Sequence, residues 1–398
     1  MKNIEDYRHV SFFDIAVSDN DGWFCDIYLN AIFHIDLKTH EIRLEKIIPV
    51  KDSRLNNQYA NIVYYSEKLY ISPRTARDIL IYDIHSKELD RIQLDTKLIG
   101  ADANNLFSSS FLYKNYVYFI PGRYPAIVRL NTENMQMEYI TGWYKEIKPY
   151  LDGSNRVIFN KGYQIEDNKL YLPFWQGNVI YRMDLDSLTG KVIRLNCSGI
   201  QCAAVNADKE DMFITTNDKC RIIRYNNDRY HIYDNMPDEF SAGSGFSLSI
   251  PYLNYLIMFP IFGNMILKFD KRTGDIKKYM GIITDYADCV KKQFPQNVYL
   301  CMKKISMTKV LLYCVHSGNI EIIDLEHDTG TVFPTVIGNA ADIQMLIRYD
   351  LSLIRIIRDD EYDIDVFINS LDGVDEKIRH VSYGKLIFRE LLCQDNKR

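Results

Sequence analysis

The sequence predicts an all-β fold made of a repeated four-stranded unit. A short aromatic strand returns every 40 to 55 residues through most of the 398-residue chain. Each copy is followed by a polar or Gly/Pro break, a second apolar strand ending near Asp or Asn, a turn, and a third strand. Tyrosine and phenylalanine, which favour strands, occur 29 and 19 times. A period of this length with several strands per unit is typical of a β-propeller.

Seven copies of the aromatic strand can be aligned. They lie at residues 23–24, 69–71, 117–120, 170–172, 212–214, 256–259 and 310–313. The spacing between copies varies from 42 to 54 residues, so insertions fall in the connecting loops and spare the strands. We therefore predict seven four-stranded blades within residues 1–358, with six and eight blades as alternatives.

The second unit shows the pattern best. Its four apolar runs, each bounded by turn residues, lie at 61–65, 69–72, 79–83 and 89–94. Proline follows the second strand in four units, at Pro73, Pro121, Pro173 and Pro260. Because proline cannot donate to a strand ladder, this recurrence marks the same strand end in each unit.

The pattern weakens after about residue 335. Residues 343–349 and 353–357 are expected either as strands of a truncated eighth unit or as strands that complete the seventh. From residue 363 onward, and most clearly at 385–392, apolar residues recur with helical spacing. We therefore predict a helical tail at residues 359–398.

The composition of the chain limits the classes of partner and the cellular location that can be expected. The net charge of −5 comes from acidic and basic residues mixed along the whole chain, which argues against a nucleic-acid partner. The polar N-terminus and the lack of any run of 18 apolar residues predict neither a signal peptide nor a membrane span, and hence a cytoplasmic protein. Eight scattered cysteines without a C-x-x-C pair suggest buried strand residues and no disulfide framework.

One face of such a propeller is the expected binding surface. The loop between the second and third strands of each unit lies on the same side as the loop that leads into the innermost strand. In this chain those loops collect amides, aromatic rings and arginines, which suit directional hydrogen bonds, flat contacts and two-pronged grips on acidic groups. The predicted ligand-binding residues are Arg74, Arg123, Tyr124, Trp175, Gln176, Asn217, Phe262, Asn264, His316, Asn57 and Asn104.

This mixture predicts non-catalytic binding of a polar small molecule, a glycan or a peptide. No H-E-x-x-H, G-x-S-x-G, P-loop or G-x-G-x-x-G motif occurs, and no cofactor is predicted. The alternative is a lyase, hydrolase or epimerase acting on a sugar or peptide, with His316 as candidate catalytic residue. A divalent metal held by Asp26, Asp102 and Asn104 could assist it. A third alternative is a scaffold that binds protein partners through blade edges or the C-terminal helix.

The units at 69–73 and 79–83 resemble those of bacterial propellers with loose repeats, of the Kelch, NHL and streptogramin-lyase type. The resemblance spans roughly residues 10–335 and implies the architecture. The Gly-His and Trp-Asp markers of WD40 blades and the double glycine of Kelch are missing. The metal-binding His/Glu arrangement of streptogramin lyases has no counterpart that can be placed here. The resemblance therefore implies a propeller without an assigned chemistry.

Overall fold

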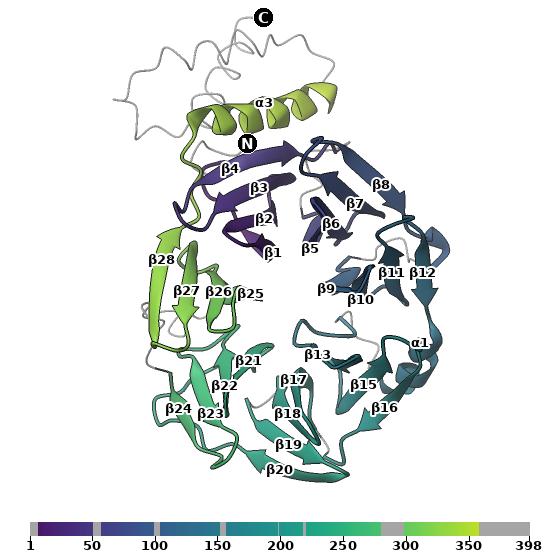
Figure 1. Cartoon of the computed structure of the whole chain (residues 1–398), viewed down its shortest axis with the longest axis vertical. Helices are drawn as coiled ribbons and strands as arrows, with labels where there is room; N and C mark the ends of the chain where they lie inside the picture. Colours follow the sequence, from purple (N-terminus) through teal and green to yellow (C-terminus); the bar gives the residue numbers. More distant parts are fainter. Residues whose placement is uncertain are drawn as a thin grey trace, which may run out of the picture.

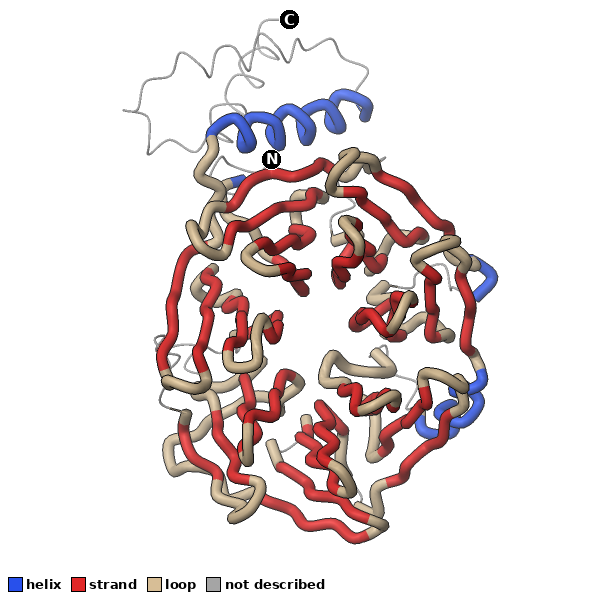
Figure 2. Tube along the Cα trace, viewed as in Figure 1, coloured by secondary structure: helices blue, strands red, loops and turns tan. Residues whose placement is uncertain are grey.

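The computed structural model describes residues 7–50, 57–98, 104–151, 157–197, 199–217, 220–279 and 298–357. It is a ring of seven four-stranded antiparallel sheets, which confirms the predicted propeller and its blade number (Figure 1). Every sheet is built from four strands that are consecutive in the chain. In each blade the first strand lies nearest the centre of the ring and the fourth lies at its rim (Figure 2).

The first four blades cover residues 12–194. Blade 1 contains β1 (Phe12–Ser18), β2 (Asp21–Asp26), β3 (Ala31–Asp36) and β4 (Ile42–Ile47). Blade 2 contains β5 (Tyr59–Tyr65), β6 (Lys68–Pro73), β7 (Asp78–Asp83) and β8 (Leu89–Gln93), followed by the 3-10 turn η2 (Thr96–Leu98). Blade 3 contains β9 (Phe107–Tyr113), β10 (Tyr116–Pro121), β11 (Ile127–Asn131) and β12 (Met137–Ile140), followed by α1 (Gly142–Ile147) and η3 (Lys148–Tyr150). Blade 4 contains β13 (Gln164–Glu166), β14 (Lys169–Pro173), β15 (Val179–Asp184) and β16 (Gly190–Arg194).

The last three blades and a helix follow. Blade 5 contains β17 (Cys202–Asp208), β18 (Asp211–Thr216), β19 (Ile222–Asn226) and β20 (Arg229–Tyr233). Blade 6 contains β21 (Leu248–Tyr252), β22 (Tyr255–Phe259), β23 (Leu267–Asp270) and β24 (Ile276–Lys278). Blade 7 contains β25 (Tyr299–Lys304), β26 (Lys309–Cys314), β27 (Asn319–Asp324) and β28 (Thr329–Pro334), and α3 (Ala340–Ile357) comes after it.

The aromatic repeat of the sequence is the second strand of each blade. This strand has a paired neighbour on either side and a neighbouring blade against each face, so both of its faces are buried. Leu69, Tyr70 and Ile71 of β6 are at most 1% exposed. Full burial explains why these strands read as continuous apolar runs and not as alternating patterns. The six cysteines in the described part of the chain are buried and free, as expected of strand residues.

The ring closes without exchanging a strand between its two ends. Strand β1 packs beside both β5 and β25, so blade 7 meets blade 1 directly. The chain before β1 forms an antiparallel bridge from His9 to Val336, and Val10 N donates to Thr335 O at 3.1 Å. Buried side chains of blades 1 and 7 share one apolar cluster. Short bridges and side-chain packing therefore hold this junction.

The expectation of strands at 343–349 and 353–357 was wrong, because both ranges lie within helix α3. Blade 7 already has the four strands of every other blade, β25 to β28, without these residues. Ile343, Leu346 and Ile347 have the spacing of one helix face and join the apolar cluster of blades 1 and 7. The helix runs outside β4 (Figure 1), where Leu44 N donates to Asp342 Oδ2 at 2.9 Å. The predicted tail at 359–398 lies outside the described residues.

A recurring turn joins the third and fourth strands in six blades. A side-chain oxygen at the end of the third strand accepts the backbone N–H groups two and three residues later, as Asp184 does from Asp186 and Ser187. The residues that start the turn are Asp36, Asp83, Asn131, Asp184, Asp270 and Asp324. The fifth residue of each turn has a positive φ, for example +62° at Lys87 and +81° at Gly274. Glycine adopts this backbone without strain, but other residues do not.

Gly274→Ala should lower the free energy of unfolding by about 2 kcal/mol. The backbone of an alanine would be strained at this positive φ, and its Cβ would crowd a neighbouring side chain. It would lie 2.4 Å from Cε1 of Tyr233. Urea denaturation followed by tryptophan fluorescence measures the effect. Gly142→Ala, where no atom lies within 4 Å of the added Cβ, is the matched control. The reverse change, Lys87→Gly, should not destabilise the protein, and a clear loss there would contradict this account.

Candidate functional site

Backbone hydrogen bonds place two sets of loops on one face of the ring, as the sequence predicted. We call this surface the loop face: the loops after the second strands together with the loops that lead into the first strands. In blade 2, Arg74 N donates to Gln58 O at 2.7 Å. Equivalent bonds join Ile27 to Ser11, Gly122 to Leu106, Trp175 to Ile158, Asn217 to Gln201 and Val315 to Val298. The loop face is therefore a braced surface on which side chains can be held in fixed positions.

Some of the predicted ligand-binding residues support these loops. Tyr124 is fully buried, and its hydroxyl donates to Asp95 O at 3.1 Å. Asn264 donates from Nδ2 to Glu239 O at 2.7 Å, while its Oδ1 accepts Ser241 N at 2.9 Å. Both side chains are thus engaged in holding the backbone of their own region.

Other predicted residues on the loop face have buried polar atoms that form no hydrogen bond among the described residues. Arg123 donates from Nη1 to Asn104 Oδ1 at 2.8 Å, but its Nε is buried without a partner among the described residues. The same holds for Oδ1 of Asn57 and of Asn217. An unpaired buried polar atom costs about 1–3 kcal/mol. Bound water or a ligand that reorders the loops would offset this cost. Phe262 and His316 are half-buried residues of loops on this face.

Arg74 occupies the most distinctive environment on the loop face. Its guanidinium carbon lies 3.9 Å from the centre of the Phe13 ring, a cation–π contact between blades 2 and 1. Among the described residues, no carboxylate lies within ion-pair distance of Arg74. Burial lowers its pKa to about 10, a shift that Tyr28 opposes. Tyr28 is 54% exposed. The result is a half-buried cation that is stacked on Phe13 and has no ion-pair partner among the described residues.

The sequence did not predict that blade 4 reaches across the ring. Residues 157–163, which we call the crossing segment, lead into β13. The Nζ atom of Lys161 donates to Phe13 O at 2.6 Å and to Leu300 O at 3.1 Å. These acceptors belong to blades 1 and 7, the two blades farthest from blade 4 around the ring. Lys161 therefore brings a second cation to Phe13, 5.3 Å from the ring centre.

Further contacts hold the crossing segment in place. Asn160 Nδ2 donates to Ser247 Oγ of blade 6 at 2.5 Å, and the hydroxyl of Tyr163 donates to Ser110 O of blade 3 at 3.4 Å. Gly162 forms a parallel bridge with Ala204 of blade 5. Two predicted site residues also support it from within blade 4. Trp175 N donates to Ile158 O at 3.0 Å, and Gln176 Nε2 donates to Val157 O at 3.4 Å.

β-Bulges explain why the two carbonyls are available to Lys161. The register of β1 shifts between Phe12 and Ile15, and that of β25 shifts between Tyr299 and Cys301. Phe13 and Leu300 are therefore extra residues whose backbone groups leave the ladder. Similar shifts occur in the first strands of blades 2, 3 and 5. A lysine amine, which has three donors, can satisfy two such carbonyls at once.

The carboxylate of Asp14, the residue after Phe13, already accepts hydrogen bonds from backbone groups. Asp14 accepts Ile15 N on Oδ1 and Ile62 N on Oδ2, at 3.0 and 3.2 Å. Its Oδ1 also lies 3.9 Å from Nζ of Lys303. Burial works to lower the pKa of Lys303, but Asp14, Tyr163 and Cys301 together outweigh burial and raise that pKa. Burial lowers the pKa of Lys161, and Asp14 opposes that shift only in part. Two lysines, Lys161 and Lys303, thus face the single carboxylate of Asp14, whereas Arg74 has no carboxylate within ion-pair distance among the described residues.

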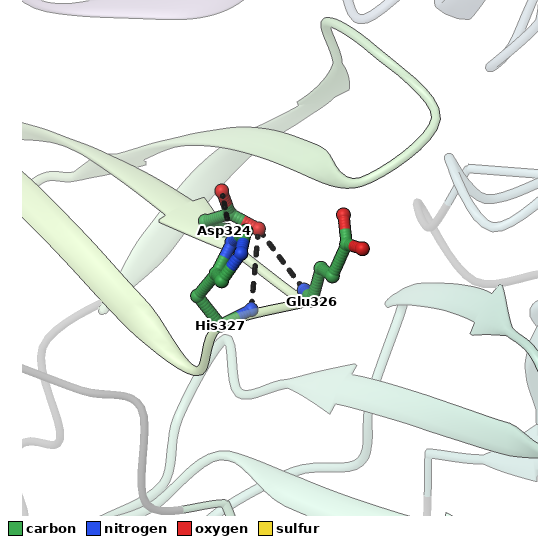
Figure 3. A group of neighbouring side chains, drawn as sticks. All are labelled: Asp324, Glu326 and His327. Atoms are coloured by element: carbon green, nitrogen blue, oxygen red, sulfur yellow. Dashed lines mark hydrogen bonds and ion pairs between the residues drawn. The ribbon is translucent and has the colours of Figure 1, made fainter.

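A group of metal-ligating side chains lies at the outer turn of blade 7. Asp324, Glu326 and His327 bring one ligand atom each within 4.8 Å of one another (Figure 3). Oδ1 of Asp324 accepts the N–H groups of Glu326 and His327, as in the turns of five other blades. The geometry of the turn accounts for this arrangement.

The metal site considered from the sequence is a different set of residues. Of these, Asp26 accepts three backbone N–H groups, and Asp102 lies outside the described residues.

Comparisons with known proteins support the fold alone. No protein-family model and no curated protein matches the sequence. Among solved structures, a streptogramin B lyase aligns with TM-score 0.51 and 15% identity, covering 72% of this chain and 85% of that one. YCF48 bound to D1 peptide aligns with TM-score 0.52 and 12% identity, covering 77% and 90%. The computationally designed Ika8 protein aligns with TM-score 0.50 and 12% identity, covering 82% and 86%. Within the described residues, no helix combines the length and apolar character needed to cross a membrane.

Proposed function

We propose that this chain binds a ligand carrying an acidic group on the loop face, with Arg74 as its anchor, and that it does not transform the ligand. The observation that carries the proposal is the half-buried guanidinium of Arg74, stacked on Phe13 and lacking a carboxylate partner among the described residues. A guanidinium grips a carboxylate or phosphate with two parallel hydrogen bonds. The exposed ring of Tyr28 nearby offers an apolar contact for the rest of the ligand.

Binding is favoured over catalysis by where the chemical groups lie. In the described part of the chain, the one cluster of three metal-ligating side chains is on the outer turn of blade 7. That turn and His316 lie on opposite faces, since one joins strands three and four and the other follows strand two. Among the described residues, His316 therefore has no such cluster beside it to support the lyase, hydrolase or epimerase alternative. YCF48, whose structure holds the D1 peptide, shows that a propeller of this kind can hold a peptide ligand.

Arg74→Gln should weaken binding of benzoate, a minimal acidic probe with an aromatic ring, by about tenfold to a hundredfold. The estimate follows from hydrogen bonds to charged groups, each worth about 1.5–3 kcal/mol. NMR titration of the wild type and variant gives the two dissociation constants. Arg43→Gln is the control, because Arg43 is an exposed arginine of β4 paired with Glu41. Equal affinity of benzoate for the wild type and Arg74→Gln would refute the proposal.

A further inference from the structure

We propose that Arg74 and Lys161 together form a two-cation site for a doubly charged group, and that the ligand is a phosphate monoester in preference to a carboxylate. This inference rests on the proposed function, because it concerns the same site. Lys161 belongs to blade 4, yet its Nζ lies 5.3 Å from the centre of the ring on which Arg74 is stacked. Both cations therefore lie over the ring of Phe13, which brings side chains of blades 2 and 4 to one residue of blade 1.

Donor counting shows that Lys161 has a hydrogen to offer. An ammonium group has three donors, and the carbonyls of Phe13 and Leu300 take two of them. These two backbone carbonyls orient the amine of Lys161 but do not neutralise it, because they carry no net charge. Arg74 contributes up to five N–H donors in a planar fork. A tetrahedral phosphate, with three terminal oxygens, can accept from both side chains at once.

The charge balance favours two negative charges over one. Asp14 is held by two backbone N–H groups, lies 3.9 Å from Lys303 and also works to raise the pKa of Lys161, so one carboxylate is set against two lysines and Arg74. A carboxylate would balance one of the two remaining cations and leave the other partly buried and unpaired. A phosphate monoester carries nearly two charges above its second pKa of about 6. At short range in a partly desolvated site, the second charge adds substantial attraction.

Three aryl probes separate charge from shape at pH 8. Phenyl phosphate is a tetrahedral dianion, phenyl sulfate a tetrahedral monoanion, and benzoate a planar monoanion. We expect wild-type protein to bind phenyl phosphate at least about tenfold more tightly than either monoanion. Equal affinity for phenyl sulfate and phenyl phosphate would overturn the inference without any variant. A phosphotyrosine tripeptide, titrated in parallel, tells a free ester from one carried by a peptide.

Two variants then test whether Lys161 is the residue that recognises the second negative charge of the phosphate. Lys161→Met should remove the preference for phenyl phosphate over phenyl sulfate, so that the affinities of the variant for these two esters agree within about threefold. Arg74→Gln should weaken all three probes. Lys309→Met, at an exposed position of β26, is the control. A preference that survives in Lys161→Met overturns the two-cation site while leaving the proposed function intact. Failure of the wild type to bind any of the three probes overturns both.

Discussion

Asp26→Ala should be among the most destabilising single changes in this chain, lowering the free energy of unfolding by about 4 kcal/mol. The side chain is 3% exposed. Its Oδ1 accepts the backbone N–H groups of Tyr28 and Leu29, and its Oδ2 accepts that of Ser11, each at 2.6 Å. Alanine would leave these donors without a partner, at about 1–3 kcal/mol for each one that stays buried. The midpoint of urea denaturation measures the loss.

Asp36→Ala is the matched control for this prediction. Asp36 also accepts two backbone N–H groups, those of Lys38 and Thr39, but its turn lies at the solvent-exposed rim of the same blade. Water can replace those bonds, so the loss should be much smaller. Asp26→Asn should fall between the two, since an amide keeps one acceptor and presents a donor where an acceptor is needed. Similar midpoints for Asp26→Ala and Asp36→Ala would show that the buried bonds contribute little.

Asp26 also bears on the proposed binding site. Its bonds to Ser11 and Tyr28 tie the chain before β1 to the loop after β2, which carries the exposed ring of Tyr28. Tyr28 in turn works to raise the pKa of Arg74 against the effect of burial. A structural carboxylate beneath the loop face therefore supports a residue with a proposed part in ligand binding.

The sequence was sufficient to predict the blades because each strand carries its own signal. Leu69, Tyr70 and Ile71 are buried on both faces, so their apolar run is visible without knowledge of the partner strands. Pro73, Pro121 and Pro173 are the last residues of their second strands, and Pro260 directly follows β22, so the prolines mark the strand ends that the pattern indicated. Arg74 was also among the residues that the sequence singled out as candidates, since a long charged side chain is not required to form a turn. Its isolation from carboxylates among the described residues became visible only in three dimensions.

The crossing segment and α3 were missed for physical reasons. Lys161 contacts residues 148 and 139 positions away, and these contacts depend on bulges in β1 and β25 that leave no clear mark in the sequence. The sequence offered one hint of the crossing segment: Lys161 and Gly162 stand where other blades begin an apolar first strand. Helix α3 was read as strands because isoleucine and leucine serve both structures. What decided between them was the three-dimensional setting: blade 7 already has its four strands, and Ile343 and Leu346 pack from one helix face onto the apolar cluster of blades 1 and 7.

Gly162→Ala should lower the free energy of unfolding by about 3 kcal/mol or displace the crossing segment, because the backbone of blade 5 leaves no room for a side chain. An added Cβ would lie 2.3 Å from Cβ of Ala204, 2.5 Å from Ala203 O and 2.5 Å from Cα of Ala204. Two of these three contacts are with backbone atoms. The double variant Gly162→Ala/Ala204→Gly should therefore recover stability only in part. Hydrogen exchange of residues 157–163 reports whether the segment moves.

Gly338→Ala serves as the control, because nothing lies within 4 Å of its added Cβ. Wild-type stability and exchange in Gly162→Ala would contradict the packing described here. The same variant also separates the two cations of the site. Lys161 adjoins Gly162, whereas Arg74 comes from blade 2 and is stacked on blade 1. Displacing the crossing segment should therefore reduce the preference for phenyl phosphate over phenyl sulfate while benzoate binding through Arg74 persists.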